Sequence, residues 1–101
     1  MAGKALEFSP IEDIVAEIGA GRLVIVADDP GRENEADLVG AAELVTPEMI
    51  AFMATHGRGL ICAPITRERA ELLDLPQMAQ RNREGHRTAF TVSVDAAEGV
   101  S

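Results

Sequence analysis

A charged stretch of ten residues, 28–37, limits what this chain can fold into more than any other segment. It reads DDPGRENEAD, with five acids and one arginine around a Pro30-Gly31 turn, and it lies between the apolar runs 23–27 and 38–42. Apolar runs favour burial, whereas Pro-Gly and clustered charges favour an exposed loop. Like charges so close together repel one another unless a cation or a proton lies among them. The sequence therefore predicts a loop held at both ends by buried segments, and this loop is the first candidate for chemistry.

The composition is that of a small globular protein. Of the 101 residues, 47% are hydrophobic and 26% are charged, so we expect a single domain over 1–101 with a disordered terminus over 1–8. A net charge of -8 provides no basic face for a polyanion. This excludes nucleic acid and anionic membranes as partners, but an anionic small molecule can still bind through a metal or a well-placed arginine.

The compartment follows from what the sequence lacks. One cysteine, Cys62, cannot close an internal disulfide. There is neither a signal-peptide pattern nor a run of 18 apolar residues. These features predict a cytoplasmic protein with no membrane partner.

Three helices are predicted from capping signals. The pattern Ser-Pro-Ile-Glu predicts a helix that has Ser9 as its N-cap and ends at Gly19 or Gly21. Similar Thr-based caps predict two further helices, over 46–57 and 66–73.

Four segments of the sequence are predicted to form β-strands. Residues 23–27 are continuously apolar, as in a strand covered on both faces, and 38–43 form a second strand after the loop. A third strand covers 60–65, and 88–94 alternates apolar and polar side chains after a long irregular loop over 74–87. This order predicts an α+β fold in which helices flank a mixed β-sheet of four strands. The sheet is expected to be incomplete, because no helix covers the last strand.

Three acids of the charged stretch are candidates for a metal site. Mg²⁺ prefers carboxylate oxygens and usually takes one or two of them, which leaves positions for substrate and water. Glu33, Glu35 and Asp37 alternate, so an extended segment would place them on one face, where one can hold the metal and another can act as a base. Arg32 can bind a hydroxyl or phosphate oxygen through its planar fork. The alternative is a solvated turn, in which Arg32 only offsets its acidic neighbours.

The other reactive side chains have ordinary interpretations. We interpret Cys62 as a small buried strand residue, because buried thiols are common and usually inert. His56 lies at a predicted helix C-terminus, where a cap or a surface position is preferred. His86, at the end of the irregular loop just before residue 88, can approach a ligand, but this is the less favoured interpretation.

With these residues identified, the chain resembles the 3,4-dihydroxy-2-butanone 4-phosphate synthases of riboflavin biosynthesis. The resemblance runs from about Ile11 to the end of the chain, and its most specific part is the Arg-Glu-Asn-Glu-x-Asp pattern of residues 32–37. The matching stretches are 22–38, 41–43, 59–62, 73–76 and 88–95.

The resemblance implies a three-layer α/β/α fold and a homodimeric, Mg²⁺- or Mn²⁺-dependent lyase. Such a lyase converts D-ribulose 5-phosphate into 3,4-dihydroxy-2-butanone 4-phosphate and formate. This chemistry suits the loop, because a divalent ion stabilises the negative charge that develops when a proton beside a ketone is removed. By position, the resemblance assigns catalysis to Glu33, Asp37, Glu35 and Cys62, substrate binding to Arg32, Glu33, Asp37 and Thr88, and the metal to Glu33.

The chain departs from the family pattern in two respects. Pro30-Gly31 replaces acids, while Ala36 and Arg87 replace glycines. Family members are also longer, and their second part supplies further metal and phosphate ligands. We therefore expect this chain to be the N-terminal part of a synthase domain and to be inactive alone. The alternative is a non-enzymatic acidic module on the same scaffold, used for subunit association or cation binding.

Overall fold

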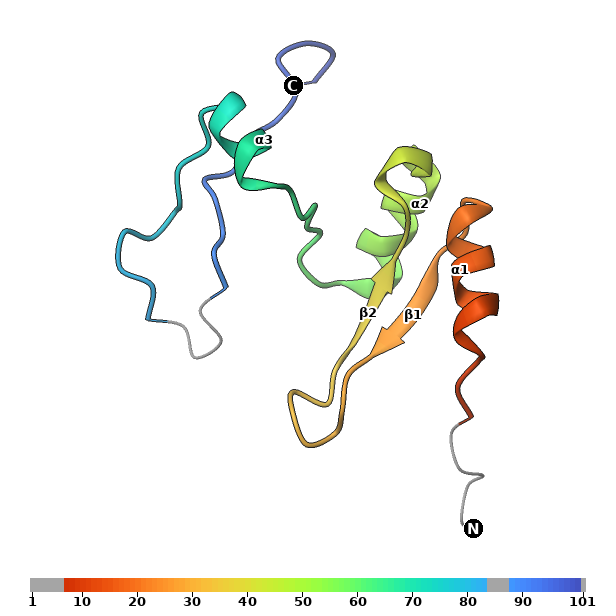
Figure 1. The fold of residues 1–101 in the computed structure, drawn as a ribbon. Helices are drawn as coiled ribbons and strands as arrows, with labels where there is room; N and C mark the ends of the chain where they lie inside the picture. The colour runs from red at the N-terminus through yellow and green to blue at the C-terminus, as the bar shows by residue number, and fades with distance from the viewer. Residues whose placement is uncertain (1–6, 84–87, 101) are drawn as a thin grey trace. The chain divides into compact units, whose positions relative to one another are not determined.

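A computed structural model describes residues 7–83 and 88–100 of the chain. The chain forms two compact units, Met1–Ala63 and Pro64–Ser101. None of the described helices is long and apolar enough to cross a membrane. The described elements confirm the predicted α+β class (Figure 1) and are, in order, α1 (Ile11–Gly19), β1 (Val24–Ala27), β2 (Ala36–Val39), a 3₁₀ helix (Ala42–Leu44), α2 (Pro47–Phe52), a π-helical turn (Met53–Gly57) and α3 (Arg67–Leu72).

Helix α1 begins one residue later than its capping signal predicts. Pro10 is the N-cap, and its carbonyl oxygen accepts the N–H groups of Asp13 at 3.1 Å and Ile14 at 3.3 Å. No side chain caps the helix, so the prediction of Ser9 as N-cap is wrong. The physical reason is that the backbone carbonyl of Pro10 already opens the helix, with φ held at -57° by the proline ring.

The chain reverses sharply between α1 and β1. The helix ends at Gly19, the first of its two predicted ends, and Gly21 follows with a left-handed φ of 83° that favours glycine. The backbone N–H of Arg22 donates to the carbonyl of Glu17 at 3.0 Å, and its Nη2 donates to Glu17 Oε1 at 3.0 Å. This exposed ion pair adds little stability by itself.

Strands β1 and β2 form an antiparallel hairpin whose loop is the charged stretch (Figure 1). Val24 pairs with Val39, and Ala27 pairs with Ala36. The predicted second strand, 38–43, is therefore displaced: β2 begins at Ala36 and ends at Val39. Strand β2 begins directly after the loop, where Ala36 pairs with Ala27. It ends at Val39 because β1 has only four residues with which to pair.

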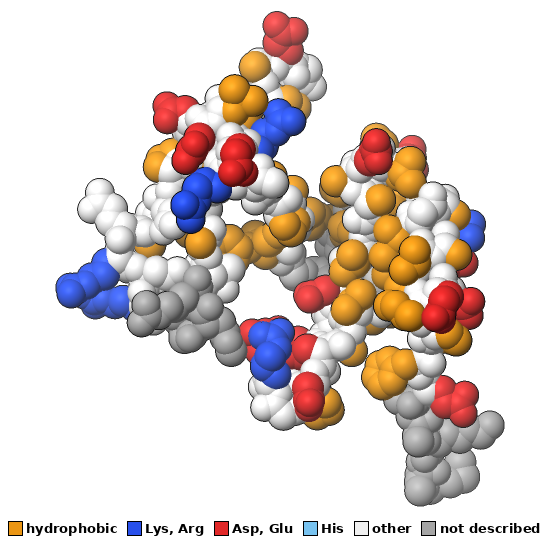
Figure 2. Space-filling model, in the orientation of Figure 1, with side chains coloured by type: hydrophobic (Ala, Val, Ile, Leu, Met, Phe, Trp, Pro, Cys, Tyr) orange, Lys and Arg blue, Asp and Glu red, His pale blue; other side chains and the backbone are white. Residues whose placement is uncertain are grey.

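The predicted burial of β1 on both faces is wrong. Among the described residues, Val24 is the one buried hydrophobic side chain, at 7% exposure, whereas Ile25 is 70% exposed and Val26 is 47% exposed. Neighbouring residues of a strand point to opposite faces, so each face of β1 carries an exposed apolar side chain. Helix α1 contacts β1, and the π-helical turn contacts β2, but neither covers Ile25 or Val26. Figure 2 shows hydrophobic side chains gathered at the surface of this unit.

The helix predicted over 46–57 is confirmed. Thr46 Oγ1 accepts the N–H of Met49 at 3.2 Å, and Pro47 is the first helical residue. The helix continues as the π-helical turn to Gly57. Arg58 closes this turn with a left-handed φ of 61°, and its N–H donates to the carbonyl of Met53 at 3.0 Å.

The next predicted strand does not form, whereas the next predicted helix does. Residues 60–65 have no place in a β ladder in the described part of the chain, so the third predicted strand is wrong. Hydrophobicity marks this segment, but a strand also needs a neighbouring backbone with which to exchange hydrogen bonds. Helix α3 confirms the third helix, because Thr66 Oγ1 accepts the N–H of Arg69 at 3.1 Å.

The fourth predicted strand, 88–94, is reduced to an isolated antiparallel bridge between Gln77 and Thr91. Two bonds make up this bridge: the N–H of Met78 donates to the carbonyl of Phe90 at 2.9 Å, and the N–H of Val92 donates to the carbonyl of Pro76 at 3.0 Å. The partner segment is irregular, as predicted for 74–87 over its described part, so it cannot extend the ladder. The mixed four-stranded sheet is thus corrected to two antiparallel strands and one bridge in the described residues.

Candidate functional site

Asp28 organises the charged loop from its first position. Its Oδ2 accepts the N–H of Glu33 at 2.9 Å, and its Oδ1 accepts the N–H of Glu35 at 2.7 Å. The backbone N–H of Asp28 also donates to the carbonyl of Glu35 at 3.1 Å. The side chain is only 17% exposed. One carboxylate therefore holds the backbone of two of the three candidate acids, Glu33 and Glu35, a role that sequence reasoning did not assign to it.

Arg32 lies between two acids of the loop. Its Nε is 3.2 Å from Asp28 Oδ2, and its Nη1 is 3.2 Å from Glu33 Oε1. The side chain is still 57% exposed, so part of the guanidinium faces solvent. The structure thus pairs Arg32 with both Asp28 and Glu33 and leaves more than half of the arginine side chain exposed.

Two local turns give the loop its shape. Gly31 N–H donates to Asp29 Oδ1 at 2.8 Å, which closes an Asx turn around Pro30. Asn34 has a left-handed φ of 53°, a conformation that asparagine tolerates better than most residues. This reversal directs the N–H groups of both neighbours, Glu33 and Glu35, toward the same carboxylate.

Asn34 gives a first testable prediction. Replacement with Val should lower the free energy of unfolding by about 1–2 kcal/mol, because a β-branched residue is strained at positive φ. Replacement with Gly should be close to neutral. Urea unfolding of both variants measures the difference, and equal stability of Asn34→Val and Asn34→Gly would contradict the assigned conformation.

The loop lowers the pKa of Asp28. The largest cause is the hydrogen bond from the Glu35 N–H, to which the Glu33 N–H and the charge of Arg32 add, while partial burial opposes the shift. Each of these donors stabilises the ionised carboxylate. The arrangement therefore depends on Asp28 being deprotonated.

This dependence gives a pH prediction. Because the pKa of Asp28 is lower in the folded loop than in the unfolded chain, its contribution to stability is present above the ordinary aspartate value and is lost as the pH falls through the lowered pKa. We expect the loop to keep its order at neutral pH and to lose it only at a pH lower than the ordinary aspartate pKa, because the pKa of Asp28 is lowered. Amide NMR shifts of Glu33 and Glu35, followed against pH, measure this. An Asp28→Asn variant should lack the transition, and a transition that persists in this variant would assign it to another group.

The three alternating acids do not share one extended face. Glu33 lies in a turn and Asn34 has positive φ, so the extended geometry behind that prediction fails at its start. Glu35 is exposed, and Asp37 lies exposed on β2 opposite Val26. The expectation is corrected because the hydrogen bonds to Asp28 impose a turn where alternation assumes a strand.

The donor set fits a hard divalent cation that is held by few protein ligands. No three His, Cys, Asp or Glu side chains within 7–83 and 88–100 are placed to hold a metal ion together. Glu33 offers carboxylate oxygens with a 30% exposed side chain. Mg²⁺ commonly keeps several waters and takes one or two protein carboxylates. Glu33 therefore fits such an ion as a single ligand, whereas a complete protein cage is not present in the described residues.

His56 is exposed in the last helical turn, as predicted, but sequence reasoning missed its contact with Phe52. Its ring lies 4.7 Å from that of Phe52, centroid to centroid, at the predicted helix end. Both residues line an open pocket of about 270 Å³ together with Asp37 and Leu38. The four-residue spacing of Phe52 and His56 was the available signal, because it places two rings on one face of a helix.

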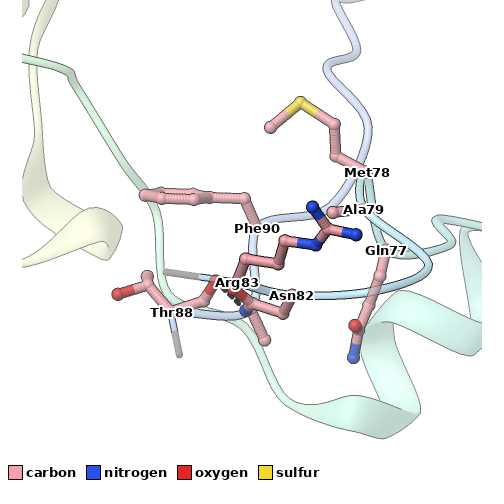
Figure 3. Close-up of a pocket in the computed structure, with 8 residues that line it drawn as sticks. Gln77, Met78, Ala79, Asn82, Arg83, Thr88 and Phe90 are labelled. Carbon is pink, nitrogen blue, oxygen red and sulfur yellow. Dashed lines mark hydrogen bonds between the residues drawn. The ribbon is translucent and has the colours of Figure 1, made fainter. Parts of the chain in front are cut away.

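Cys62 and Thr88 lie in different units. Cys62 is exposed, and its Sγ is 3.9 Å from the carbonyl oxygen of Leu60, so its interpretation as a buried strand residue is wrong. Residues 60–65 do not pair with a strand in the described part of the chain, so no sheet buries Cys62 and its thiol remains at the surface. Thr88 lines a pocket in the second unit (Figure 3). His86 lies outside the described residues.

The sequence matches one family over most of its length. A family model described as 3,4-dihydroxy-2-butanone 4-phosphate synthase matches residues 12–101. The riboflavin biosynthesis protein RibBA of Salinispora arenicola is 55% identical over 94 residues, which are 93% of this chain and 22% of that protein. The 3,4-dihydroxy-2-butanone 4-phosphate synthase of Pyricularia oryzae is 56% identical over 89 residues, which are 88% of this chain and 38% of that protein.

The fold matches the same family. A crystal structure of a 3,4-dihydroxy-2-butanone 4-phosphate synthase in complex with two magnesium ions superposes with a TM-score of 0.84 at 55% identity, over 90% of this chain and 42% of that one. The chain thus spans less than half the length of these relatives. The family model, the relatives and the shared fold agree, and the chain belongs to the 3,4-dihydroxy-2-butanone 4-phosphate synthase family.

Proposed function

We propose that this chain carries part of the active site of a lyase of riboflavin biosynthesis. The lyase uses Mg²⁺ or Mn²⁺ and converts D-ribulose 5-phosphate into 3,4-dihydroxy-2-butanone 4-phosphate and formate. The observation that carries the proposal is the Arg32–Glu33 pair, joined at 3.2 Å and held by the Asp28 carboxylate. It lies in the most specific part of the family pattern. The names of the relatives and the magnesium complex of one of them support the same reaction class.

The loop residues have complementary roles in this proposal. A divalent ion, when bound, supplies positive charge that stabilises oxyanions as they develop. Glu33 holds that ion, and Arg32 orients a substrate oxygen through guanidinium N–H groups that Asp28 and Glu33 leave available. Asp37 contacts the substrate, while Glu35 supports the site as a further acid that can exchange a proton. Asp28 has a different task, because it positions Glu33 without touching the substrate.

Two residues beyond the loop complete the proposed set. Cys62, whose thiol is exposed, and Thr88, which lines a pocket of its own unit, are proposed to line the substrate site. The exposure of Cys62 suits this role, since a thiol must be accessible to contact a ligand.

The chain is proposed to work as part of a larger assembly. It spans 22% and 38% of the two relatives described above, and its described residues contain no three-ligand metal site. We propose that the remaining active-site groups come from polypeptide that these relatives have outside the matched region. We also propose that the assembly is a cytoplasmic homodimer and that the chain alone does not turn over substrate.

A chimeric synthase tests the proposal. The matched region of the Pyricularia oryzae synthase is replaced by this chain, and formate release from ribulose 5-phosphate is measured with Mg²⁺. We expect the folded chimera to release formate and the 101-residue chain alone to release none. A folded chimera without turnover would refute the proposed reaction. Robust turnover by the isolated chain would refute the need for a larger assembly.

A further inference from the structure

The first unit, Met1–Ala63, contains an open pocket of about 270 Å³ that the reaction proposed above does not use beyond Asp37. Three segments of this unit form its walls. They contribute Ile25 from β1, Ala36, Asp37 and Leu38 from β2, and Phe52, His56 and Gly57 from α2 and the π-helical turn. The pocket therefore connects the strand that follows the charged loop with the helix end that carries His56.

The π-helical turn sets the position of His56 against β2. The N–H of Arg58 donates to the carbonyl of Met53, five residues earlier, at 3.0 Å, whereas a regular α-helix joins residues four apart. Gly57 lets this turn approach the strand, because a β-carbon on Gly57 would lie 3.2 Å from Leu38 Cδ1. That distance is shorter than an ordinary contact between carbon atoms. Turns of this kind often occur at functional sites, and here the turn places His56 on the pocket wall.

The imidazole of His56 is supported by an aromatic neighbour. Its ring centroid lies 4.7 Å from that of Phe52, and the two ring planes are tilted by 45°. Tilted rings at this distance attract each other through their complementary charge distributions. Both side chains are exposed, so the ring pair remains accessible from solvent. The contact thus restricts the imidazole to a position on the pocket wall without burying it.

Asp37 and His56 carry the two polar side chains among the described residues of the pocket wall. Neither side chain forms a hydrogen bond or an ion pair with another residue in 7–83 or 88–100. A carboxylate accepts hydrogen bonds, whereas an imidazole N–H donates one. A hydroxyl group of a ligand can donate to the first and accept from the second, while the apolar wall contacts the carbon atoms of the ligand. The pocket is therefore complementary to a hydroxylated carbon chain.

We infer that His56 is a specificity-determining residue of the substrate site proposed above. Its imidazole N–H binds a hydroxyl oxygen of the substrate's carbon chain, and the same hydroxyl group donates to the Asp37 carboxylate. Phe52 and Leu38 contact the C–H groups of that chain. The identity of the substrate, D-ribulose 5-phosphate, rests on the proposed function. The hydroxyl site itself rests on the pocket, on the ring contact and on the two polar side chains.

Three variants separate the hydrogen bond of His56 from the shape of the turn. His56→Phe keeps a ring for the contact with Phe52 but removes both nitrogen atoms. His56→Gln keeps a hydrogen-bond donor and an acceptor without a ring. Thr55→Val is the matched control, because Thr55 precedes His56 in the same turn, is exposed and does not line the pocket.

The experiment is a titration of the ¹⁵N-labelled 101-residue chain, followed by the amide signals of Leu38 and Gly57. The ligands are ribulose 5-phosphate, unphosphorylated ribulose and pentan-2-one, which has the same ketone chain without hydroxyl groups. We expect both hydroxylated ligands to shift these signals and pentan-2-one to leave them unchanged. His56→Phe should weaken the binding of ribulose by about three- to tenfold, as for the loss of one hydrogen bond. His56→Gln should recover part of this loss, and Thr55→Val should stay within about twofold.

Binding of pentan-2-one as tight as that of ribulose would overturn the inference, and so would equal affinities of His56→Phe and the wild type. Equal losses in His56→Phe and Thr55→Val would also overturn it, because the effect would then belong to the turn as a whole. If His56→Phe does not fold, His56→Leu removes the same nitrogen atoms and should show the same loss. Unchanged binding by His56→Leu would overturn the inference as well.

The chimeric synthase gives a second readout and separates the two proposals. His56→Phe should raise the KM for ribulose 5-phosphate by about three- to tenfold and change kcat by less than about twofold, because the hydroxyl contact is made in the ground state and the transition state alike. A purely structural role of His56 would instead lower the apparent kcat and leave KM unchanged. An inactive chimera with His56-dependent binding of ribulose refutes the reaction and supports the hydroxyl site. An active chimera whose KM does not respond to His56→Phe refutes the hydroxyl site alone.

Discussion

Replacing Glu33 with Gln in the chimeric synthase is expected to lower formate release from ribulose 5-phosphate by about 100-fold or more. The amide keeps the size of the side chain but removes the negative charge that attracts a divalent cation. The ion pair between Glu33 Oε1 and Arg32 Nη1, now at 3.2 Å, is lost as well. The measurement is the rate of formate release at increasing Mg²⁺ concentration. The variant should need more Mg²⁺ to reach half of its maximal rate, and its maximal rate should be lower.

Glu12→Gln is the matched control for this change. Glu12 lies in the first turn of α1, outside the charged loop, and its replacement removes the same carboxylate charge. We expect this variant to retain the wild-type rate within about twofold, since exposed charges contribute little. If Glu33→Gln retains full activity, Glu33 is not the metal ligand. If Glu12→Gln loses activity equally, the effect reflects the net charge of the chain.

The second large effect is expected at Asp28, which is proposed to position Glu33 without touching the substrate. Asp28→Ala removes the acceptor of the Glu33 and Glu35 N–H groups and the partner of Arg32 Nε. Groups that orient a metal ligand typically contribute 10- to 100-fold to metal affinity or activity. We therefore expect Asp28→Ala to weaken Mg²⁺ affinity in the chimera by about 10- to 100-fold. Isothermal titration with Mg²⁺ measures this directly.

Conservative variants separate positioning from general charge. Asp28→Asn keeps one acceptor oxygen and should recover part of the Mg²⁺ affinity that Asp28→Ala loses. Asp13→Ala, on the exposed first turn of α1, removes one carboxylate without disturbing the loop. Equal Mg²⁺ affinity of Asp28→Ala and the wild type, or equal losses in Asp28→Ala and Asp13→Ala, would show that Asp28 does not position Glu33.

Local signals predicted the helices better than the strands. The caps at Thr46 and Thr66 depend on bonds within three residues, and both form as expected. The strands predicted over 60–65 and 88–94 depend on partners elsewhere in the chain. Hydrophobic pattern cannot supply those partners, and the described residues contain one isolated bridge at Thr91. For the same reason the predicted burial of β1 fails at Ile25 and Val26, since burial depends on what packs against a strand.

The sequence by itself determined the family, the α+β class and the adjacency of Arg32 and Glu33, because these follow from residue order and from short-range bonds. Only the tertiary structure decided that Asp28 is the residue that holds the loop. Its hydrogen bonds reach residues five and seven positions later in the sequence. They form because the hairpin brings Glu33 and Glu35 back to the first residue of the loop, Asp28.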